Sequence, residues 1–355
     1  MSREFAGARR LPVGLRYALP FLGGATISIK DGMKPLQVFV VDLGGTKCSA
    51  ATVDRAGRIL RCHTLPVDRT STSAPIRQVL QLAVEFAGGK KPTGAFAAAA
   101  ISVPGLVRKN GTVWAPNLPG WNRIPLASRL RGSLGLPIAV ESDRNAAILG
   151  ESWLGAARGK SDAILLMIGT GIGVGILSGG RVIRGAHELS GCAGWMTITR
   201  EEVLEARRCG ELESLVAGPA IARIARERLQ RGEKSSLSRL DPAQITACDV
   251  ATAARQHDRL ALDVFNRFGE LLGFAVANLV SLFDPQSVVL GGGMAAAADL
   301  YLRPLRKAML ERAQPLAGRQ VRIVVSKLGA KANLLGCAGL AWKSLADQRL
   351  QIDLP

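Results

Sequence analysis

Three glycine-rich turns, each directly after a short apolar segment, are the strongest candidates for chemistry in this sequence. Residues 38–41 lead through Asp42 into the first turn, residues 163–168 into the second, and residues 287–290 into the third. The turns comprise Gly44, Gly45, Thr46 and Lys47; Gly169, Thr170, Gly171 and Gly173; and Gly291, Gly292 and Gly293. Because glycine has no Cβ atom, backbone N–H groups can approach an anion closely, and two facing turns could hold a polyphosphate.

Apolar segments on both sides of the first two turns predict hairpins. Residues 50–53 and 174–177 predict returning strands, whereas a P-loop or dinucleotide-binding turn leads from a strand into a helix. A single glycine hairpin is a common structural turn, so phosphate binding depends on the combination of turns. Asp42 lies at the end of the first strand, where an acidic residue can cap the following glycine turn.

Asp143 begins the segment Asp143-Arg144-Asn145 and is expected at the N-terminus of a helix. A carboxylate placed there can accept the proton of a substrate hydroxyl. Aspartate is also favoured as a cap at a helix N-terminus, so the residue pattern alone favours the cap, with a catalytic carboxylate as the alternative.

The order of the predicted elements indicates an α/β protein with an internal duplication. A pattern of strand, glycine hairpin, strand, turn and strand occurs twice, from residue 38 and from residue 163. Helices are predicted over 74–87 and over 260–283, and in the second of these apolar residues recur every three or four positions. With 355 residues, 48% of them hydrophobic, the chain can bury one large core or two ordinary ones, which excludes disorder throughout.

These motifs together resemble the ROK family of bacterial sugar kinases and repressors, within the actin-like ATPase superfamily. Residues 42–47 look like the first phosphate motif of that family, and residues 169–173 look like its second. The resemblance covers about residues 36–345. Further matches, in order, are residues 103–105, residues 115–121 with Asn117, Asp143 with Asn145 and Glu151, and residues 290–293.

The resemblance implies a two-lobed actin-like ATPase, or ribonuclease H-like, fold with a duplicated mixed sheet in each lobe. We expect residues 37–147 to form a smaller lobe, completed by a C-terminal helix over 335–348, and residues 148–334 to form a larger lobe. Residues 1–36 are expected to be a disordered extension or the product of an upstream start codon, with Met33 as a natural start.

The same resemblance implies an ATP-dependent sugar kinase with Asp143 as its catalytic base and two lobes that close on the substrate. ATP would lie between the lobes, with its phosphates at the first two turns and its adenosine beside residues 291–293. Asp42 would hold Mg²⁺ through water, and Thr46 and Lys47 would lie by the phosphates unless Lys47 is only solvated. The sugar site would comprise Asn117, Ser142, Asp143, Cys192, Trp195 and Glu213. Homodimers are common in the family, so a homodimer is expected.

Several positions depart from the family pattern where the sugar should bind. Ser142 replaces an asparagine, while Cys192 and Trp195 replace a glutamate and a zinc-binding histidine. Because the downstream cysteine cluster is also missing, we expect no structural zinc. Cys192 is predicted to be a small packed thiol, and Trp195 either stacks on a sugar ring or fills the volume of the zinc site. Glu213 either contacts a sugar hydroxyl or is solvated. These changes predict an altered acceptor, such as another hexose, an amino sugar or a less polar polyol.

The net charge and the cysteine spacing limit which binding partners and which cellular compartment are expected. Lys and Arg total 46 against 28 Asp and Glu, a formal net charge of +18, but no basic run exceeds two residues. We therefore expect a solvated surface that favours anionic substrates, and no specific DNA binding, because residues 1–36 are too short for a winged helix-turn-helix. Six widely spaced cysteines suit a reducing cytoplasm, and no apolar stretch approaches the ~20 residues of a membrane span.

Two other functions compete with the kinase. A catalytically weak sugar or nucleotide sensor of the same fold is the alternative, because a fold does not fix a function. A dinucleotide oxidoreductase would rest on residues 291–293 after a strand, but it explains neither the turn after Asp42 nor the Asp143 segment.

Overall fold

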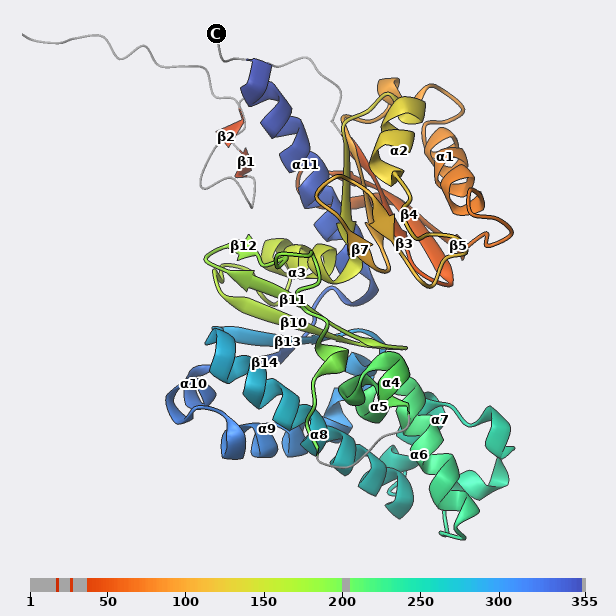
Figure 1. Ribbon diagram of the computed structural model, residues 1–355, viewed down its shortest axis with the longest axis vertical. Coiled ribbons are helices and arrows are strands. Elements are labelled where there is room, and N and C mark those ends of the chain that lie inside the picture. Colours follow the sequence, from red (N-terminus) through yellow and green to blue (C-terminus); the bar gives the residue numbers. More distant parts are fainter. Residues whose placement is uncertain (1–16, 19–25, 28–36, 200–204, 353–355) are drawn as a thin grey trace, which may run out of the picture.

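Two five-stranded mixed sheets organise the protein, and they lie one above the other in Figure 1. The computed structural model describes residues 17–18, 26–27, 37–199 and 205–352. The first sheet contains β3 (Gln37–Leu43), β4 (Lys47–Asp54), β5 (Ile59–Pro66), β6 (Ala99–Val103) and β9 (Ile138–Ser142). The second contains β10 (Ala163–Ile168), β11 (Ile172–Ser178), β12 (Arg181–Val182), β13 (Ser287–Gly291) and β14 (Arg322–Val325).

The two sheets repeat one topology. Their orders are β5-β4-β3-β6-β9 and β12-β11-β10-β13-β14. In each, three strands form an antiparallel meander, and two later strands add in parallel beside the first strand of the meander. The predicted duplication is confirmed. The other described strands are short: β1 (Tyr17–Ala18) pairs with β2 (Thr26–Ile27), and β7 (Leu106–Val107) pairs with β8 (Val113–Trp114).

Eleven helices are described around these sheets. They are α1 (Ala74–Phe86), α2 (Leu126–Leu134), α3 (Asp143–Leu154), α4 (Ala206–Cys209), α5 (Glu211–Val216), α6 (Gly218–Gln230), α7 (Ala247–Arg255), α8 (Arg259–Phe283), α9 (Ala298–Arg312), α10 (Pro315–Gln320) and α11 (Ala332–Ile352). None of them, over the described residues, is long and apolar enough to cross a membrane. The prediction for residues 1–36 falls, apart from β1 and β2, outside the described residues.

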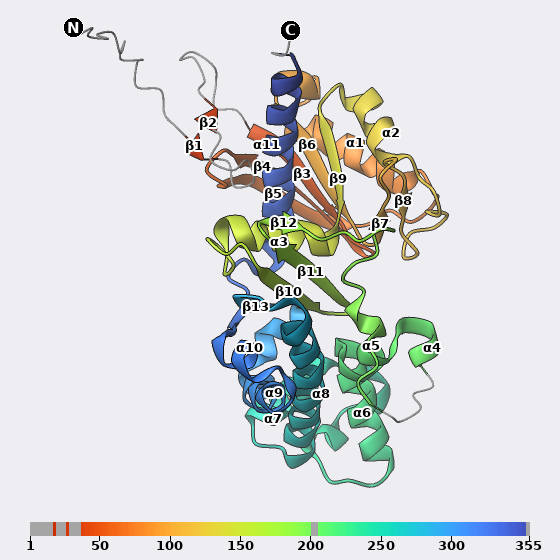
Figure 2. The same ribbon diagram turned by 60° about the vertical axis from the view of Figure 1, so that its left-hand side comes forward.

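Strand periodicity explains how the first sheet is covered. Phe39 and Val41 on β3 face the core beneath α1 and α2, whereas Val38 and Val40 face α11 on the other side. Because successive side chains of a strand point to opposite faces, a strand apolar at every position needs cover on both faces. Figure 2 shows α11 running along the first sheet, with α3 below it.

Helix α3 is shared between the two sheets. Ala146 packs in the apolar cluster between the first sheet and α11. Ala147 and Ile148 pack in the apolar cluster between α3 and the second sheet. The close crossing of α3 and α11 requires glycine on both helices. A Cβ on Gly336 would lie 1.7 Å from the Ala146 carbonyl oxygen, and one on Gly150 would lie 2.2 Å from that of Ala332. The start of α3, where Asp143 lies, is therefore fixed at the junction of the two halves.

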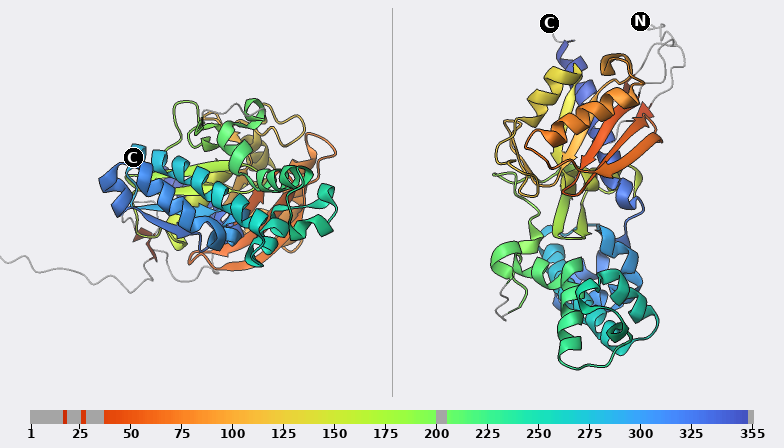
Figure 3. Two further views of the ribbon diagram at one scale, coloured as in Figure 1. Left: turned by 90° about the horizontal axis from the view of Figure 1, so that it is seen from below. Right: turned by 90° about the vertical axis from the view of Figure 1, so that its right-hand side faces the viewer.

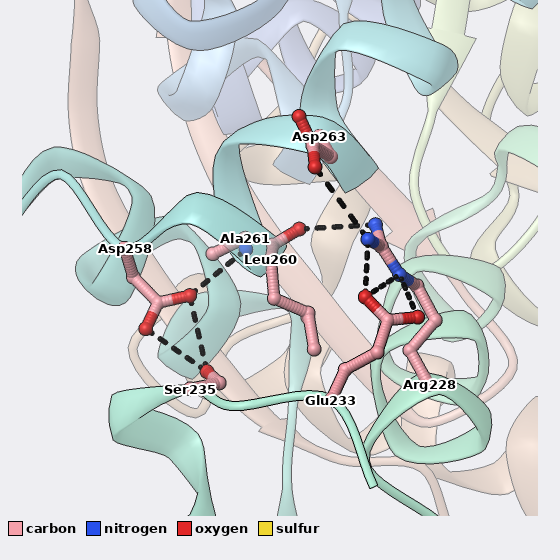
Figure 4. A network of polar contacts seen from close by, with 7 residues as sticks. All are labelled: Arg228, Glu233, Ser235, Asp258, Leu260, Ala261 and Asp263. Atoms are coloured by element: carbon pink, nitrogen blue, oxygen red, sulfur yellow. Dashed lines mark hydrogen bonds and ion pairs between the residues drawn. The ribbon is translucent and has the colours of Figure 1, made fainter. Parts of the chain in front are cut away.

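Helices α5 to α9 bury the other face of the second sheet, as the right-hand view of Figure 3 shows. The long helix α8 begins in a polar network that also ties down the end of α6 (Figure 4). Asp258 caps α8 by accepting from the Ala261 N–H at 3.0 Å, and Arg228 of α6 donates to Glu233 at 2.9 Å. This network lies away from the residues predicted to do chemistry and holds the helical layer together.

Candidate functional site

A cavity of about 410 Å³ lies where the first strands of both sheets end. Its wall is formed by residues that lie up to 291 positions apart in the chain, from Asp42 to Asn333. Eleven predicted site residues line it: Asp42, Gly44, Gly45, Asn117, Asp143, Gly169, Thr170, Gly171, Gly173, Glu213 and Gly292. The structure therefore brings together residues from all three glycine turns, the predicted metal ligand and the predicted base.

Asp42 is the penultimate residue of β3 and lines the cavity, and one of its carboxylate oxygens accepts two hydrogen bonds. Its Oδ1 accepts from the Ser102 hydroxyl at 2.7 Å and from the Asn333 amide at 2.9 Å. Burial raises the pKa of Asp42, and these two hydrogen bonds oppose that rise. Among the described residues, no hydrogen bond or ion pair is recorded for Oδ2. A desolvated carboxylate held by one oxygen fits a cation that would offset its charge.

Asp143 is the first residue of α3 and follows β9 directly. Its Oδ1 accepts from the Arg144 N–H at 2.7 Å, so it satisfies one of the free N–H groups of the helix N-terminus. Burial raises the pKa of Asp143 to about 6, with a further rise from the charge of Asp42. The carboxylate thus contacts the helix start as a cap does, and it also has the raised pKa of a general base.

The second glycine turn is held by Glu213 of α5. The Glu213 Oε2 atom accepts from the Ile172 N–H at 2.7 Å, and the turn is closed by a bond of 2.9 Å from the Gly169 N–H to the Gly171 carbonyl. A Cβ on Gly171 would lie 2.7 Å from Glu213 Oε2, so the close approach requires glycine. Burial raises the pKa of Glu213. The prediction of a merely solvated Glu213 is wrong, and its contact with a sugar stays a prediction.

Four predicted phosphate-binding positions and the predicted sugar position Ser142 lie outside the cavity wall. Thr46 and Lys47 are exposed, because Thr46 ends the turn and Lys47 begins β4, which leads away from the cavity. In the third turn only Gly292 lines the cavity, since Gly291 is paired within the sheet and Gly293 begins the next helical turn. Ser142 is buried, and its hydroxyl has no hydrogen-bond partner in the described part of the chain.

Cys192 and Trp195 also lie outside the cavity wall. The prediction of a packed Cys192 thiol is wrong: Cys192 is exposed, whereas its neighbours Ala193 and Gly194 are buried. Trp195 is 59% exposed and therefore fills no interior volume. Both side chains lie in a short turn whose buried positions are taken by the two smallest residues, which leaves the larger side chains on the surface.

The sequence did not single out Asn333, Ser102 or the side chain of Arg144. Asn333 begins the C-terminal helix, and nothing in its local pattern shows that it will reach Asp42 from 291 positions away. Arg144 stands next to the predicted base in the sequence, but the carbonyl groups that its side chain bonds lie more than 40 positions away, at Glu188 and Ser190. Within the described ranges, no group of three His, Cys, Asp or Glu residues could hold a metal ion, and the absence of zinc stays a prediction.

Two mixed sheets of identical topology around a glycine-lined cavity define an actin-like ATPase fold. The comparison with known families agrees, because the model of the ROK family matches residues 38–344. The chain belongs to the ROK family.

Enzymes and regulators both occur among its similar proteins. The glucokinase of Thermotoga maritima is 31% identical over 316 residues, which cover 87% of this chain and 98% of that protein. The crystal structure of a ROK family glucokinase from Streptomyces griseus in complex with glucose and AMPPNP has a TM-score of 0.71 and 30% identity, covering 86% of this chain and 99% of that one. A ROK family transcriptional regulator, a homologue of the E. coli MLC protein, has a TM-score of 0.82 and 25% identity, covering 93% and 83%.

Proposed function

We propose that this protein is an ATP-dependent sugar kinase that transfers the γ-phosphoryl group to a hydroxyl of a hexose or hexose derivative. The observation that carries the proposal is the position of Asp143, which has a pKa of about 6 and lines the same cavity as glycines of all three turns. The similarity to glucokinases, one of them in complex with glucose and AMPPNP, supports the same assignment.

Asp143 is the proposed general base. Above pH 6 its carboxylate is ionised and can take the proton of the acceptor hydroxyl while the oxygen attacks the γ-phosphorus. Its N-terminal place on α3 and the bond from the Arg144 N–H keep the carboxylate in one orientation. The proton is thus accepted at a fixed point of the cavity wall.

The glycine turns are the proposed phosphate cradle. Gly44 and Gly45 lie on the wall formed by the first sheet, and Gly169, Gly171 and Gly173 lie on the wall formed by the second. Their backbone N–H groups can approach phosphate oxygens because no Cβ atoms intervene. Thr170 lines the same cavity, and Gly292 is the proposed contact for the adenosine end of ATP.

Asp42 is the proposed ligand of Mg²⁺, which it would hold through water. The fit rests on its desolvated carboxylate, whose Oδ1 is fixed by Ser102 and Asn333. When bound, Mg²⁺ supplies positive charge that neutralises the phosphates during phosphoryl transfer. The role of Ser102 and Asn333 is to hold Asp42 in place, so no rearrangement of the carboxylate is needed.

Asn117 and Glu213 are the proposed contacts for acceptor hydroxyls, since both line the cavity that contains Asp143. Ser142, Cys192 and Trp195 would join them when residues 37–147, completed by 335–348, close on residues 148–334. The proposal also includes three predictions from the sequence: the enzyme acts in the cytoplasm, it is a homodimer, and it holds no structural zinc.

A regulator that senses a sugar or nucleotide is the second candidate. It is favoured by the TM-score of 0.82 to a transcriptional regulator and by the absence of Cys192 and Trp195 from the cavity wall. Such a protein would bind its ligands without turnover.

The test is ADP formation from Mg-ATP over a panel of glucose, other hexoses, amino sugars, N-acetylated sugars and polyols. We expect one acceptor to exceed an Asp143→Asn blank by at least a hundredfold, because a positioned base contributes ~10²–10⁴-fold. The same samples are examined for nucleotide binding by calorimetry. Binding of ATP with no acceptor above the blank would reject the kinase in favour of the regulator.

A further inference from the structure

The loop over residues 185–191 is held on one side by Arg144, a buried arginine whose side chain the proposed mechanism does not use. Arg144 Nε donates to the Ser190 carbonyl at 3.0 Å, and Nη2 donates to the Glu188 carbonyl at 3.3 Å. Arg144 is only 9% exposed. Among the described residues it forms no ion pair with a carboxylate, so its fixed charge is directed at two carbonyl groups of one loop.

The stem of Arg144 passes between the second glycine turn and the end of this loop. A Cβ on Gly173 would lie 3.7 Å from Arg144 Cβ, and one on Gly191 would lie 3.4 Å from Arg144 Cδ. Gly191 has a φ of +86°, and its carbonyl accepts from the Val174 N–H at 2.8 Å. The aliphatic stem of Arg144 therefore lies beside Gly191, at the end of the loop, in addition to the two hydrogen bonds of its guanidinium group.

A second arginine ties the beginning of the loop to the same short segment. Arg184 donates through Nε to Glu141 Oε2 at 3.1 Å, and its carbonyl accepts from the Ser190 N–H at 3.0 Å. Glu141 and Arg144 flank Asp143 on β9 and α3. The loop is thus attached on both sides of the proposed base, and it leads directly into Cys192 and Trp195.

We infer that Arg144 is a positioning residue that couples the 185–191 loop to the Asp143 segment and thereby sets acceptor affinity. The inference rests on the proposed function for its kinetic consequence and on the contacts alone for its structural consequence. Arg144 lines the cavity and its stem lies beside Gly173 of the second glycine turn, but both side-chain hydrogen bonds of its guanidinium group go to the 185–191 loop. Removing the guanidinium group while keeping an apolar stem should therefore weaken acceptor binding and spare ATP binding.

Kinetics with the best acceptor from the panel test the first consequence. Arg144→Met keeps an apolar stem and removes both donors, and we expect it to raise the acceptor KM about tenfold while the ATP KM stays within about twofold. Arg144→Lys, which keeps the charge and can reach one carbonyl, should raise the acceptor KM about threefold. Arg306→Met is the matched control, because Arg306 donates to the Ile323 carbonyl at 3.0 Å and does not line the cavity. An unchanged acceptor KM, or equal rises in both KM values, would overturn the inference.

Hydrogen exchange of the ligand-free protein tests the second consequence independently of turnover. The Glu188 and Ser190 N–H groups are bonded within the loop region, to the carbonyls of Gly185 and Arg184. We expect peptides covering 185–191 to exchange at least fivefold faster in Arg144→Met, and at the wild-type rate in Arg306→Met. If Arg144→Met does not fold, Arg144→Lys serves for the same comparison. Unchanged exchange in a folded Arg144 variant would overturn the coupling, whereas absent turnover with faster exchange would reject only the kinase.

Discussion

The raised pKa of Asp143 fits the proposed role of this residue as a general base. Burial raises that pKa from 3.8 to about 6, because the cavity wall solvates a carboxylate less well than water does. The value lies close to neutral pH, which is where a general base works best.

The pH dependence of turnover follows from this pKa. A base must be deprotonated to act, so kcat/KM for the acceptor should be constant above pH 7 and fall about tenfold per pH unit below about pH 6. Steady-state rates between pH 5 and 8.5, with the concentration of Mg-ATP held constant, measure this limb. A flat profile down to pH 5 would remove Asp143 from the role of base.

The same raised pKa predicts a cost in stability. Below pH 3.8 Asp143 is protonated in both the folded and the unfolded state, so its raised pKa costs no stability. Between pH 3.8 and 6 the residue is ionised in the unfolded state but still protonated in the folded state, so the free energy of unfolding falls as the pH rises. Above pH 6 the full loss of stability is present. Asp143→Asn removes the charge and keeps an oxygen for the Arg144 N–H. We expect the variant to be more stable at pH 8 by on the order of 1–3 kcal/mol, and by less at pH 5. Urea unfolding at both pH values measures the difference, and a less stable variant at pH 8 would contradict it.

At the scale of elements, the crossing of α3 and α11 is what places Asp143 between the sheets. Gly336 lets the backbones of the two helices meet, since a Cβ there would lie 1.7 Å from the Ala146 carbonyl oxygen. Asn333 on the same helix reaches Asp42. One helix pair therefore positions both acidic residues of the proposed site.

Gly336→Ala should therefore damage stability and turnover together. The added methyl group forces the helices apart, which we expect to cost about 1–3 kcal/mol and to lower kcat by displacing Asp143. Gly132→Ala in α2 is the control, because a Cβ there meets nothing within 4 Å and alanine favours a helix. Thermal unfolding and turnover of both variants test this, and a Gly336→Ala protein as stable and active as Gly132→Ala would contradict it.

Sequence periodicity predicted the elements well because each depends on local pattern. The strand expected over residues 163–168 is β10, and the helix expected over 260–283 is α8, which begins one residue earlier. The convergence of the glycine turns was expected from the family resemblance. The bonds from Asn333 to Asp42 and from Arg144 to the 185–191 loop were not, since they join segments far apart in the chain.

Exposure was the weakest part of the prediction. Cys192 was expected to be packed, but the local turn buries Ala193 and Gly194 instead. A turn of a few residues has no periodicity from which its buried side could be recognised. Lys47 shows the same limit, because the phosphate motif does not reveal where the hairpin leaves the cavity.

At the scale of the whole molecule, the formal net charge of +18 favours anionic ligands through long-range attraction. ATP is strongly anionic and most sugars are neutral, so salt should affect their binding differently. We expect the KM for ATP to rise several-fold between 50 and 500 mM KCl, because screening shortens the reach of the charges, while the KM for a neutral acceptor stays within twofold. Equal salt dependence of the two KM values would show that the net charge plays no part in binding ATP.

The most direct test of the proposed kinase compares the wild-type protein with Asp143→Asn at saturating Mg-ATP and acceptor. Formation of the sugar phosphate is followed by mass spectrometry, and ATP affinity is measured by calorimetry on the same samples. We predict one sugar phosphate per ADP from the wild type, and from Asp143→Asn an unchanged ATP affinity with product formation at least a hundredfold slower. Product formation at the wild-type rate by Asp143→Asn would contradict the role assigned to Asp143, and the absence of sugar phosphate from both proteins would contradict the kinase.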